Sequence, residues 1–311
     1  MVHSDPARST APYRAPARWV GLARAVGRLL GSLNQNWLTR TGLVLTLLFV
    51  MVAIFGPIFA GDPLKLSFDR LAAPSLQHPF GTDHVGRDLL ARVLAGARIS
   101  LSVSLASVVG GLTLALPLGM TAGYFATTWV DEIIMRTVDV ILALPLFLLG
   151  LVVIGMTGHA STQIGPVEVS PAAKIVVLIA IASIPMFTRV ARAATLVERS
   201  EDYVGALRIL GVSRVTIIGS EILVNVLQPV LVQAFFWMAI AVFAEAALSF
   251  LGLGIQPPQP TLGNLLYDAR GYILYGAWWY SVFPGLMLSF AIVSLNLLGD
   301  GLSDLLDPQL R

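Results

Sequence analysis

The feature that most constrains the fold is a series of apolar stretches, each about long enough to cross a lipid bilayer. They run Gly42–Ala60, Ile99–Phe125, Ile133–Met156, Ile175–Ala191, Val226–Leu251 and Tyr280–Gly299. A helix needs about 20 mostly apolar residues to cross roughly 30 Å of hydrocarbon. Charged residues make up only 12% of the chain, about half the share that is usual in soluble domains. We therefore predict an all-α, polytopic membrane protein with six transmembrane helices.

The arginines are distributed unevenly, and their distribution predicts how the chain is oriented. Residues 1–41 contain six arginines and a single acidic residue, Asp5. Positively charged segments of membrane proteins tend to stay on the cytoplasmic side, and an even number of spans then places both termini there. We expect a cytoplasmic N-terminal tail (1–41), a six-helix membrane domain (42–299) with an outer loop (61–98) and a cytoplasmic loop (192–221), and a cytoplasmic C-terminal tail (300–311).

The N-terminal tail contains a pattern that is typical of a helix lying on a membrane surface. Apolar side chains recur at spacings of three and four residues, at Trp19, Leu22, Val26, Leu29, Leu33 and Trp37. Arg24 and Arg28 fall on another face, where they would contact the anionic headgroups of membrane lipid. The pattern predicts an interfacial amphipathic helix. A helix that packs against the membrane bundle is the alternative.

The composition excludes several kinds of chemistry. The chain has no cysteine, and therefore no disulfide and no thiolate site. Its two lysines, Lys65 and Lys174, do not follow a glycine, whereas the phosphate-binding loop of many ATPases requires Gly-Lys-Ser/Thr. Asp268 and Asp300 are expected on opposite sides of the membrane, so they cannot form a catalytic pair. We expect no enzyme activity, no cofactor and no nucleic-acid binding, with any ATP bound by partner subunits.

The longest predicted cytoplasmic loop, residues 192–221, has the pattern of two short helices joined by a turn. Ser200 can cap a helix with acidic residues in its first turn. Gly211 interrupts the apolar face of that helix, and Ser213 begins a second helix. A helix–glycine–helix unit that protrudes from the membrane favours an interaction with a soluble partner protein.

Five further stretches carry motifs that point to a family. They are HPFGTDHVGRDLLAR (His78–Arg92), VDVILALP (Val138–Pro145), EAALSFLGLGIQPPQPTLG (Glu245–Gly263), WWY (Trp278–Tyr280) and NLLGDGLSDLLDP (Asn296–Pro308). Together with the cytoplasmic loop, they resemble the dipeptide/oligopeptide/nickel permease family of ABC importers, specifically its C-type subunit. The similarity covers roughly residues 40–308, so residues 1–40 lie outside it.

The resemblance implies the type I permease fold of ABC importers and a location in the bacterial cell membrane. It also implies three kinds of partner: a homologous B-type permease subunit, two cytoplasmic ATPase subunits or domains, and an extracytoplasmic solute-binding protein. The expected function is that of a permease subunit that forms half of the pathway of an ATP-driven importer for di- or oligopeptides or a similar small solute. An ion-coupled secondary transporter is the alternative.

The cytoplasmic loop resembles the coupling loop of these permeases, whose pattern is Glu-Ala-Ala, three residues, Gly, and a downstream Ile-Leu-Pro. The corresponding residues here are Gly205, Ala206, Leu207, Gly211, Ile222, Leu223 and Val224. Gly205 stands where glutamate is usual, and Val224 stands where proline is usual. The residues that we expect to couple the chain to the ATPase are Tyr203, Gly205, Ala206, Leu207 and Gly211.

Glu245 is an acidic residue inside a predicted span. A charged side chain at the centre of a bilayer costs about 2.5 kcal/mol or more, so this carboxylate is expected to face the pathway or a polar partner. Two roles are consistent with this position. Glu245 is either a residue of the pathway or subunit interface, or the acceptor of a hydrogen bond between helices.

The outer loop carries a cluster of ionisable residues at His78, Asp83, Arg87 and Asp88, with His84 beside them. Two histidines and two aspartates could bind a metal ion, but the family pattern accounts for His78 and the GTD–GRD residues as structural. We therefore expect no metal site. Docking of the solute-binding protein against this loop is the role that we favour.

Overall fold

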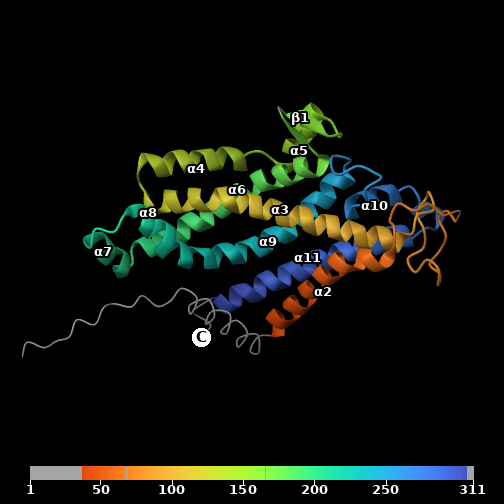
Figure 1. Cartoon of the computed structure of the whole chain (residues 1–311), viewed down its shortest axis with the longest axis horizontal. Helices are drawn as coiled ribbons and strands as arrows, with labels where there is room; N and C mark the ends of the chain where they lie inside the picture. The colour runs from red at the N-terminus through yellow and green to blue at the C-terminus, as the bar shows by residue number, and fades with distance from the viewer. Residues whose placement is uncertain (1–36, 68, 165, 307–311) are drawn as a thin grey trace, which may run out of the picture.

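A computed structural model describes residues 37–67, 69–164 and 166–306. The described chain forms an elongated bundle of helices (Figure 1). Residues 19–36 of the predicted amphipathic helix lie outside the described residues, and so do residues 307–311 of the predicted C-terminal tail.

Helices that are long and apolar enough to cross a membrane make up the body of the bundle. They are α2 (Trp37–Ala60), α3 (Leu89–Tyr124), α6 (Pro171–Arg199), α9 (Leu223–Phe250) and α11 (Trp279–Leu306). Two shorter helices, α4 (Trp129–Leu142) and α5 (Leu146–Thr157), pass the same test only as a pair. The described residues therefore contain five spans, or six if the pair counts as one span. This confirms the predicted all-α membrane fold.

The third predicted span is bent, although the sequence pattern predicted one continuous helix. The axes of α4 and α5 differ by 79°. Pro145 is the N-cap residue of α5, and a proline has no backbone N–H with which to continue the hydrogen bonds of α4. The residue before a proline is also forced out of the helical region. The break therefore follows from the Leu144–Pro145 step.

Several helices extend beyond the predicted limits of their spans, and α3 and α11 are two of them. α3 begins at Leu89, ten residues before the apolar run, because the Asp88 carboxylate accepts a hydrogen bond from the Ala91 amide (2.9 Å) and caps the helix. α11 continues to Leu306, through the start of the predicted C-terminal tail. The start of α3 is therefore set by its cap rather than by hydropathy. The end of α11 likewise does not coincide with the end of its apolar run.

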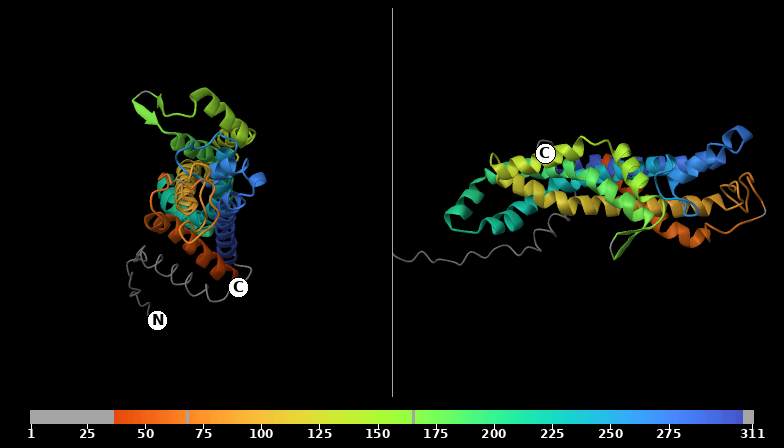
Figure 2. Two further views of the ribbon diagram at one scale, coloured as in Figure 1. Left: turned by 90° about the vertical axis from the view of Figure 1, so that its right-hand side faces the viewer. Right: turned by 90° about the horizontal axis from the view of Figure 1, so that it is seen from above.

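The remaining elements are short, and most of them lie at the two ends of the bundle. α7 (Asp202–Ile209), α8 (Arg214–Thr216) and a π-helical turn, η1 (Ile217–Ile222), connect α6 to α9. α10 (Leu262–Ala269) and a 3₁₀ turn, η2 (Ile273–Tyr275), connect α9 to α11. The views in Figure 2 show the α7–α8 unit projecting from one end, while loop 61–88, α10 and η2 form the other. We call these the α7 end and the α10 end.

A two-stranded antiparallel hairpin, β1 (Thr162–Ile164) and β2 (Val167–Val169), stands beside the end of α5 (Figure 1). Lys174 of α6 fixes the base of this hairpin. Its ammonium donates hydrogen bonds to the carbonyls of Thr157, Gly158 and Ala160 and to the hydroxyl of Thr162, at 2.7–3.2 Å.

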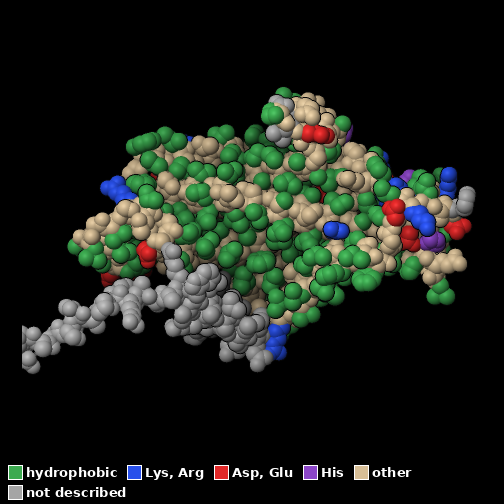
Figure 3. All heavy atoms as spheres, in the orientation of Figure 1, with side chains coloured by type: hydrophobic (Ala, Val, Ile, Leu, Met, Phe, Trp, Pro, Cys, Tyr) green, Lys and Arg blue, Asp and Glu red, His purple; other side chains and the backbone are tan. Residues whose placement is uncertain are grey.

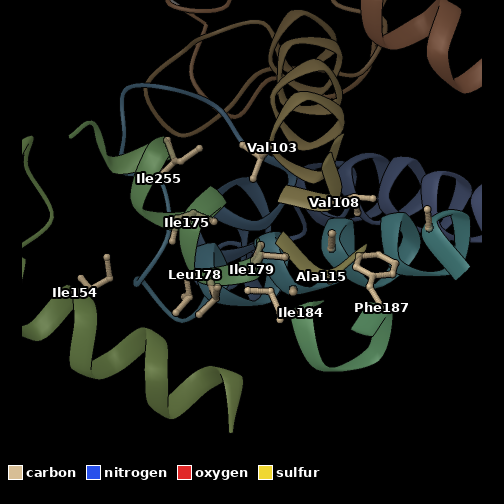
Figure 4. Packing of buried hydrophobic residues seen from close by; sticks show 14 residues of the cluster. Val103, Val108, Ala115, Ile154, Ile175, Leu178, Ile179, Ile184, Phe187 and Ile255 are labelled. Atoms are coloured by element: carbon tan, nitrogen blue, oxygen red, sulfur yellow. The ribbon is translucent and has the colours of Figure 1, made fainter. Parts of the chain in front are cut away.

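The largest cluster of buried side chains lies where α3, α5, α6 and α9 meet (Figure 4). Small residues let α3 approach α6 closely, at intervals of four residues: Gly111, Ala115, Gly119 and Gly123. A methyl group added at Gly119 would lie 2.5 Å from the Thr188 carbonyl oxygen. Small residues at this spacing are typical of close helix pairs in membranes.

Hydrophobic side chains also cover much of the surface of the bundle. Figure 3 shows a mainly hydrophobic middle, with most of the visible charged side chains toward the two ends. Exposed side chains on the surface of α2 and α5 include Leu47, Phe59 and Leu148. Such a surface requires an apolar surrounding, which the hydrocarbon core of a bilayer provides.

Candidate functional site at the α7 end and along α9

The start of α7 differs from the sequence-based prediction. Ser200 does not cap α7: it is the C-cap residue of α6, and its hydroxyl donates to the Val197 carbonyl (2.7 Å). The N-cap position of α7 belongs to Glu201, and Asp202 lies in the first turn, as predicted. The preceding helix runs further than its apolar pattern indicated, so the expected cap is used at the end of α6 instead.

The turn after α7 follows the predicted helix–glycine–helix pattern. Gly211 has a φ of +74°, a left-handed conformation that a glycine adopts without steric cost. The Val212 amide donates back to the Leu207 carbonyl (3.1 Å), which closes the turn. Ser213 then caps α8 by accepting a hydrogen bond from the Thr216 amide (3.1 Å).

α7 is held on one side and exposed on the other. Val204 is fully buried and packs in a cluster with Met120, Tyr124, Ile217 and Val226. The opposite face is open, and its exposed residues include Gly205, Ala206, Ile209 (89% exposed) and Leu210 (77% exposed). A short helix therefore presents small and apolar residues away from the bundle.

Tyr203 joins α7 to the helices on either side of it. Its hydroxyl donates to a Glu198 carboxylate oxygen of α6 (2.6 Å), and the Asn225 amide of α9 donates to the same oxygen (2.7 Å). Burial and the hydrogen bond to Glu198 raise the pKa of Tyr203 to about 12. The phenol is therefore protonated at physiological pH and remains a donor that orients α7.

Glu245 is fully buried between helices, near the C-terminal end of α9. Its two carboxylate oxygens accept hydrogen bonds from the hydroxyls of Ser100 on α3 (2.6 Å) and Ser249 one turn further along α9 (2.8 Å). Burial of this carboxylate in an apolar span would be unfavourable without partners, and hydroxyl donors from two helices satisfy its hydrogen bonds.

Asp83 is the centre of the loop motif at the α10 end. The carboxylate is fully buried and accepts hydrogen bonds from the side chains of Arg87 (2.7 Å) and Arg92 and from the amides of Val85 and Arg87. Burial alone raises the pKa of Asp83, but the amide of Arg87 and the charges of Arg92 and Arg87 more than offset this, so the pKa lies below its ordinary value.

The other residues of the motif are occupied by local contacts. The His78 ring nitrogen lies 2.8 Å from Asp88, which also caps α3. His84 lies 3.1 Å from the Tyr280 hydroxyl and stacks on Tyr272. Within the described part of the chain, no three histidine, aspartate or glutamate side chains are grouped so that they could hold a metal ion.

Two ion pairs between α4 and α6 were not predicted from the sequence. Arg192 makes a bidentate contact with Asp131, with both N···O distances 2.7 Å, and Arg189 contacts Asp139 at 2.7 Å. Their partners are 61 and 50 residues apart in the chain. The signal that could have found them is the presence of unpaired charges near the same end of two predicted spans.

Comparison with known proteins decides the family. Residues 115–311 match the family described as the binding-protein-dependent transport system inner membrane component. The chain belongs to this family. The permease is 36% identical to a dipeptide transport system permease protein of Alkalihalophilus pseudofirmus, over 90% of this chain and 88% of the relative. It is 40% identical to a putative peptide transport system permease protein of Brucella suis, over 88% of each chain.

A solved structure supports the fold of this permease. Its fold is similar to a chain of the methionine ABC transporter MetNI in an inward-facing conformation, with a TM-score of 0.55. The match covers 70% of this chain and 97% of that chain at 20% sequence identity. The predicted type I importer permease fold is thereby confirmed.

Family membership confirms several predictions and rejects one alternative. The chain is a multi-pass inner-membrane permease subunit of an ABC importer, not an enzyme and not an ion-coupled secondary transporter. A permease of this kind works with ATPase subunits and a further permease subunit.

Proposed function

We propose that this permease subunit imports di- or oligopeptides together with a homologous B-type permease subunit and two ATPase subunits or domains. The single observation that carries the substrate class is the similarity to permeases named for dipeptide and peptide transport over most of both chains. An extracytoplasmic solute-binding protein delivers the peptide. Both termini are cytoplasmic, which makes the α7 end the cytoplasmic end.

The exposed face of α7 is the surface that binds the ATPase. Ala206 and Gly205 leave room for close approach of a partner backbone, and nothing lies within 4 Å of a methyl group added at Gly205. Ile209 and Leu210 add apolar area that a partner can bury. Because Val204 and Tyr203 fix α7 to α3, α6 and α9, a force on α7 is transmitted to the membrane helices.

Replacing Ala206 with tryptophan tests this assignment. We expect peptide uptake and substrate-stimulated ATP hydrolysis to fall to background, because an indole ring on the exposed face keeps the ATPase at a distance. The measurement is uptake of a labelled dipeptide and phosphate release by the assembled importer in vesicles. Amounts of protein in the membrane should match the wild type, since position 206 contacts no core cluster.

The matched control is Val197→Trp, which introduces the same indole ring at an exposed position on α6, five residues before α7 begins. Its uptake should remain near that of the wild type. Normal substrate-stimulated ATP hydrolysis in Ala206→Trp would contradict the coupling role of α7. If the wild-type importer hydrolysed ATP normally but took up none of the peptides, that result would instead contradict the substrate class.

Glu245 is proposed to connect helices rather than to carry an ion. Glu245→Gln should keep uptake within about twofold of the wild type, because the amide still exchanges hydrogen bonds with Ser100 and Ser249. Glu245→Leu should destabilise the bundle by about 1–3 kcal/mol, because two buried hydroxyls lose their acceptor. Uptake and thermal unfolding in detergent measure the two effects. Loss of uptake by a stably folded Glu245→Gln would favour a direct role in the pathway.

The solute-binding protein is proposed to dock on the loop at the α10 end. His78 and Asp88 are partly exposed there, with side-chain exposures of 21% and 25%. Asp83 and Arg87 are buried and contribute by maintaining the shape of the loop. Exposed apolar side chains of the adjacent η2 turn, Leu274 and Tyr275, extend the same surface.

A further inference from the structure

A cavity of about 430 Å³ opens at the α7 end, beside the turn that joins α3 to α4. Four segments contribute to it: the end of α3, the start of α4, the end of α6 and the unit formed by α7, α8 and the turn between them. The lining residues are Tyr124, Phe125, Ala126, Thr128, Arg199, Arg208, Val212 and Arg214. Three of them are arginines and none is acidic, so the lining is strongly positive.

The three arginines of the cavity have no carboxylate partner among the described residues. No aspartate or glutamate oxygen of the described chain lies within 4.0 Å of Arg199, Arg208 or Arg214. The other arginines of α4 and α6 are all paired: Arg136 with Glu132, Arg189 with Asp139, and Arg192 with Asp131. Among the arginines of α4, α6, α7 and α8, the three without a carboxylate partner in the described chain are therefore those that line the cavity.

Aromatic and backbone groups hold these arginines in place. The Arg208 guanidinium carbon lies 5.1 Å from the centre of the Tyr124 ring, and that of Arg214 lies 6.0 Å from the Phe125 ring. Arg199 donates to the Tyr124 carbonyl (3.0 Å). A contact with an aromatic face orients a guanidinium without using its N–H donors. Most donors of the cluster thus remain available to an anion.

The start of α4 adds a further positive contribution. Thr128, which lines the cavity, is the N-cap residue of α4, and no side chain caps this helix end. The amino end of a helix favours an anion. The acidic residues of the first turn, Asp131 and Glu132, are engaged by Arg192 and Arg136 and are thereby neutralised.

We propose that this arginine cavity binds the phosphate group of an anionic phospholipid. Guanidinium groups donate paired hydrogen bonds that match phosphate oxygens, and basic pockets between membrane helices bind anionic headgroups. Trp129 is the next residue after Thr128 of the cavity lining, and its side chain is 73% exposed. Ile133 and Val140 are exposed further along α4. These spacings place the three side chains on one face of α4, which gives the acyl chains of a bound lipid an apolar surface.

The neighbouring apolar face favours a lipid over the two other sources of negative charge, a free phosphate ion and an acidic segment of a partner protein. Neither of these would need an exposed tryptophan and an apolar helix face beside the arginines. The proposal holds whichever leaflet contains the α7 end, so it is independent of the proposed orientation and of the substrate.

Native mass spectrometry of the full chain tests the proposal, with phosphatidylglycerol or phosphatidylcholine added to the detergent. Wild-type protein should retain phosphatidylglycerol and not phosphatidylcholine. The double variant Arg208→Gln/Arg214→Gln should retain about tenfold less phosphatidylglycerol or lower, because two charge-assisted contacts are lost. The matched control, Arg70→Gln, removes an exposed arginine of the loop at the α10 end, far from the cavity, and should behave as the wild type.

Three outcomes would overturn the proposal. Equal retention of phosphatidylglycerol by the glutamine double variant and the wild type would do so. Displacement of the lipid by millimolar inorganic phosphate would assign the site to a free anion. Loss of ATPase co-purification with unchanged lipid retention would assign the arginines to the partner protein.

A second variant separates a binding defect from a folding defect. Arg208→Lys/Arg214→Lys keeps both charges and should retain more phosphatidylglycerol than the glutamine variant, with the same unfolding temperature as the wild type in lipid-free detergent. Retention as low as that of the glutamine variant, in a protein with wild-type stability, would contradict phosphate binding through these charges.

Discussion

Replacing Asp83 with asparagine is expected to lower the free energy of unfolding by about 3–5 kcal/mol, the usual effect of removing one partner of a buried ion pair. The Asp83 carboxylate is the acceptor for Arg87 and for Arg92, whose side chain is fully buried. Two further nitrogens of Arg92 have no partner among the described residues. Without the carboxylate, the buried Arg92 guanidinium would keep its charge and lose the one carboxylate within 4.0 Å of it in the described part of the chain.

Thermal unfolding of the purified chain in detergent measures this effect. Asp69→Asn is the matched control, because Asp69 lies in the same loop with an exposed side chain, and its unfolding temperature should change little. Binding of the solute-binding protein to the Asp83→Asn variant should weaken as well, because the loop loses its shape. An Asp83→Asn protein that unfolds at the wild-type temperature would contradict the structural role of this carboxylate.

The lowered pKa of Asp83 predicts the pH range in which its contribution is lost. An aspartate with a lowered pKa in the folded state stabilises the protein at pH values above its ordinary pKa of 3.8. The contribution disappears as the pH falls through the lower, folded-state pKa. The difference in stability between wild type and Asp83→Asn should therefore be constant from pH 7 to about pH 5 and should shrink below about pH 4.

Replacing Gly119 with alanine is expected to destabilise the membrane bundle by about 1–3 kcal/mol, because the added methyl group overpacks the contact between α3 and α6. That group would lie 2.5 Å from the Thr188 carbonyl oxygen and 2.6 Å from the Ala191 methyl carbon. A backbone carbonyl cannot move aside without a shift of the whole helix. The two longest helices of the described bundle, α3 and α6, would then separate slightly along the row of small residues that includes Gly119.

Gly110→Ala is the control for this substitution on the same helix. A methyl group at Gly110 meets only the Ala180 methyl carbon, at 3.5 Å, which is an ordinary contact. Alanine is favoured over glycine within a helix by roughly 0.5–1 kcal/mol, so this variant should be as stable as the wild type or slightly more stable. Opposite signs of the two effects are expected in thermal unfolding; equal effects would indicate that α3 and α6 do not pack at Gly119.

Hydropathy predicted the membrane spans but not all of their boundaries. It missed the first ten residues of α3 because Arg92 and Arg98 lower the local hydropathy, yet Arg92 is buried against Asp83. The bend between α4 and α5 was missed because the apolar run continues across Pro145. Hydropathy averages over a window, whereas caps and prolines act at single positions.

The sequence predicted part of the candidate site correctly and part of it wrongly. Gly211 and Ser213 mark the turn after α7 through local conformational preferences, and these predictions were correct. Ser200 was wrongly expected to cap α7, because α6 continues to Arg199, past the end of its apolar run, and Ser200 is the C-cap residue of α6. The residues assigned to ATPase coupling stay a prediction. Tyr203, Gly205 and Ala206 are exposed on α7, whereas Leu207 is only partly exposed and packs against the cluster that contains Val204.

By itself, the sequence determined that this chain lies in a membrane, crosses it several times and belongs to a permease family. These properties follow from segments of about 20 residues and from motifs that are continuous in the chain. Only the tertiary structure decided that Glu245 meets Ser100, 145 residues away, and that three unpaired arginines share one cavity. Such contacts depend on which helix faces pack together, because a charge buried in a low-dielectric interior is tolerated only where a partner from another segment reaches it.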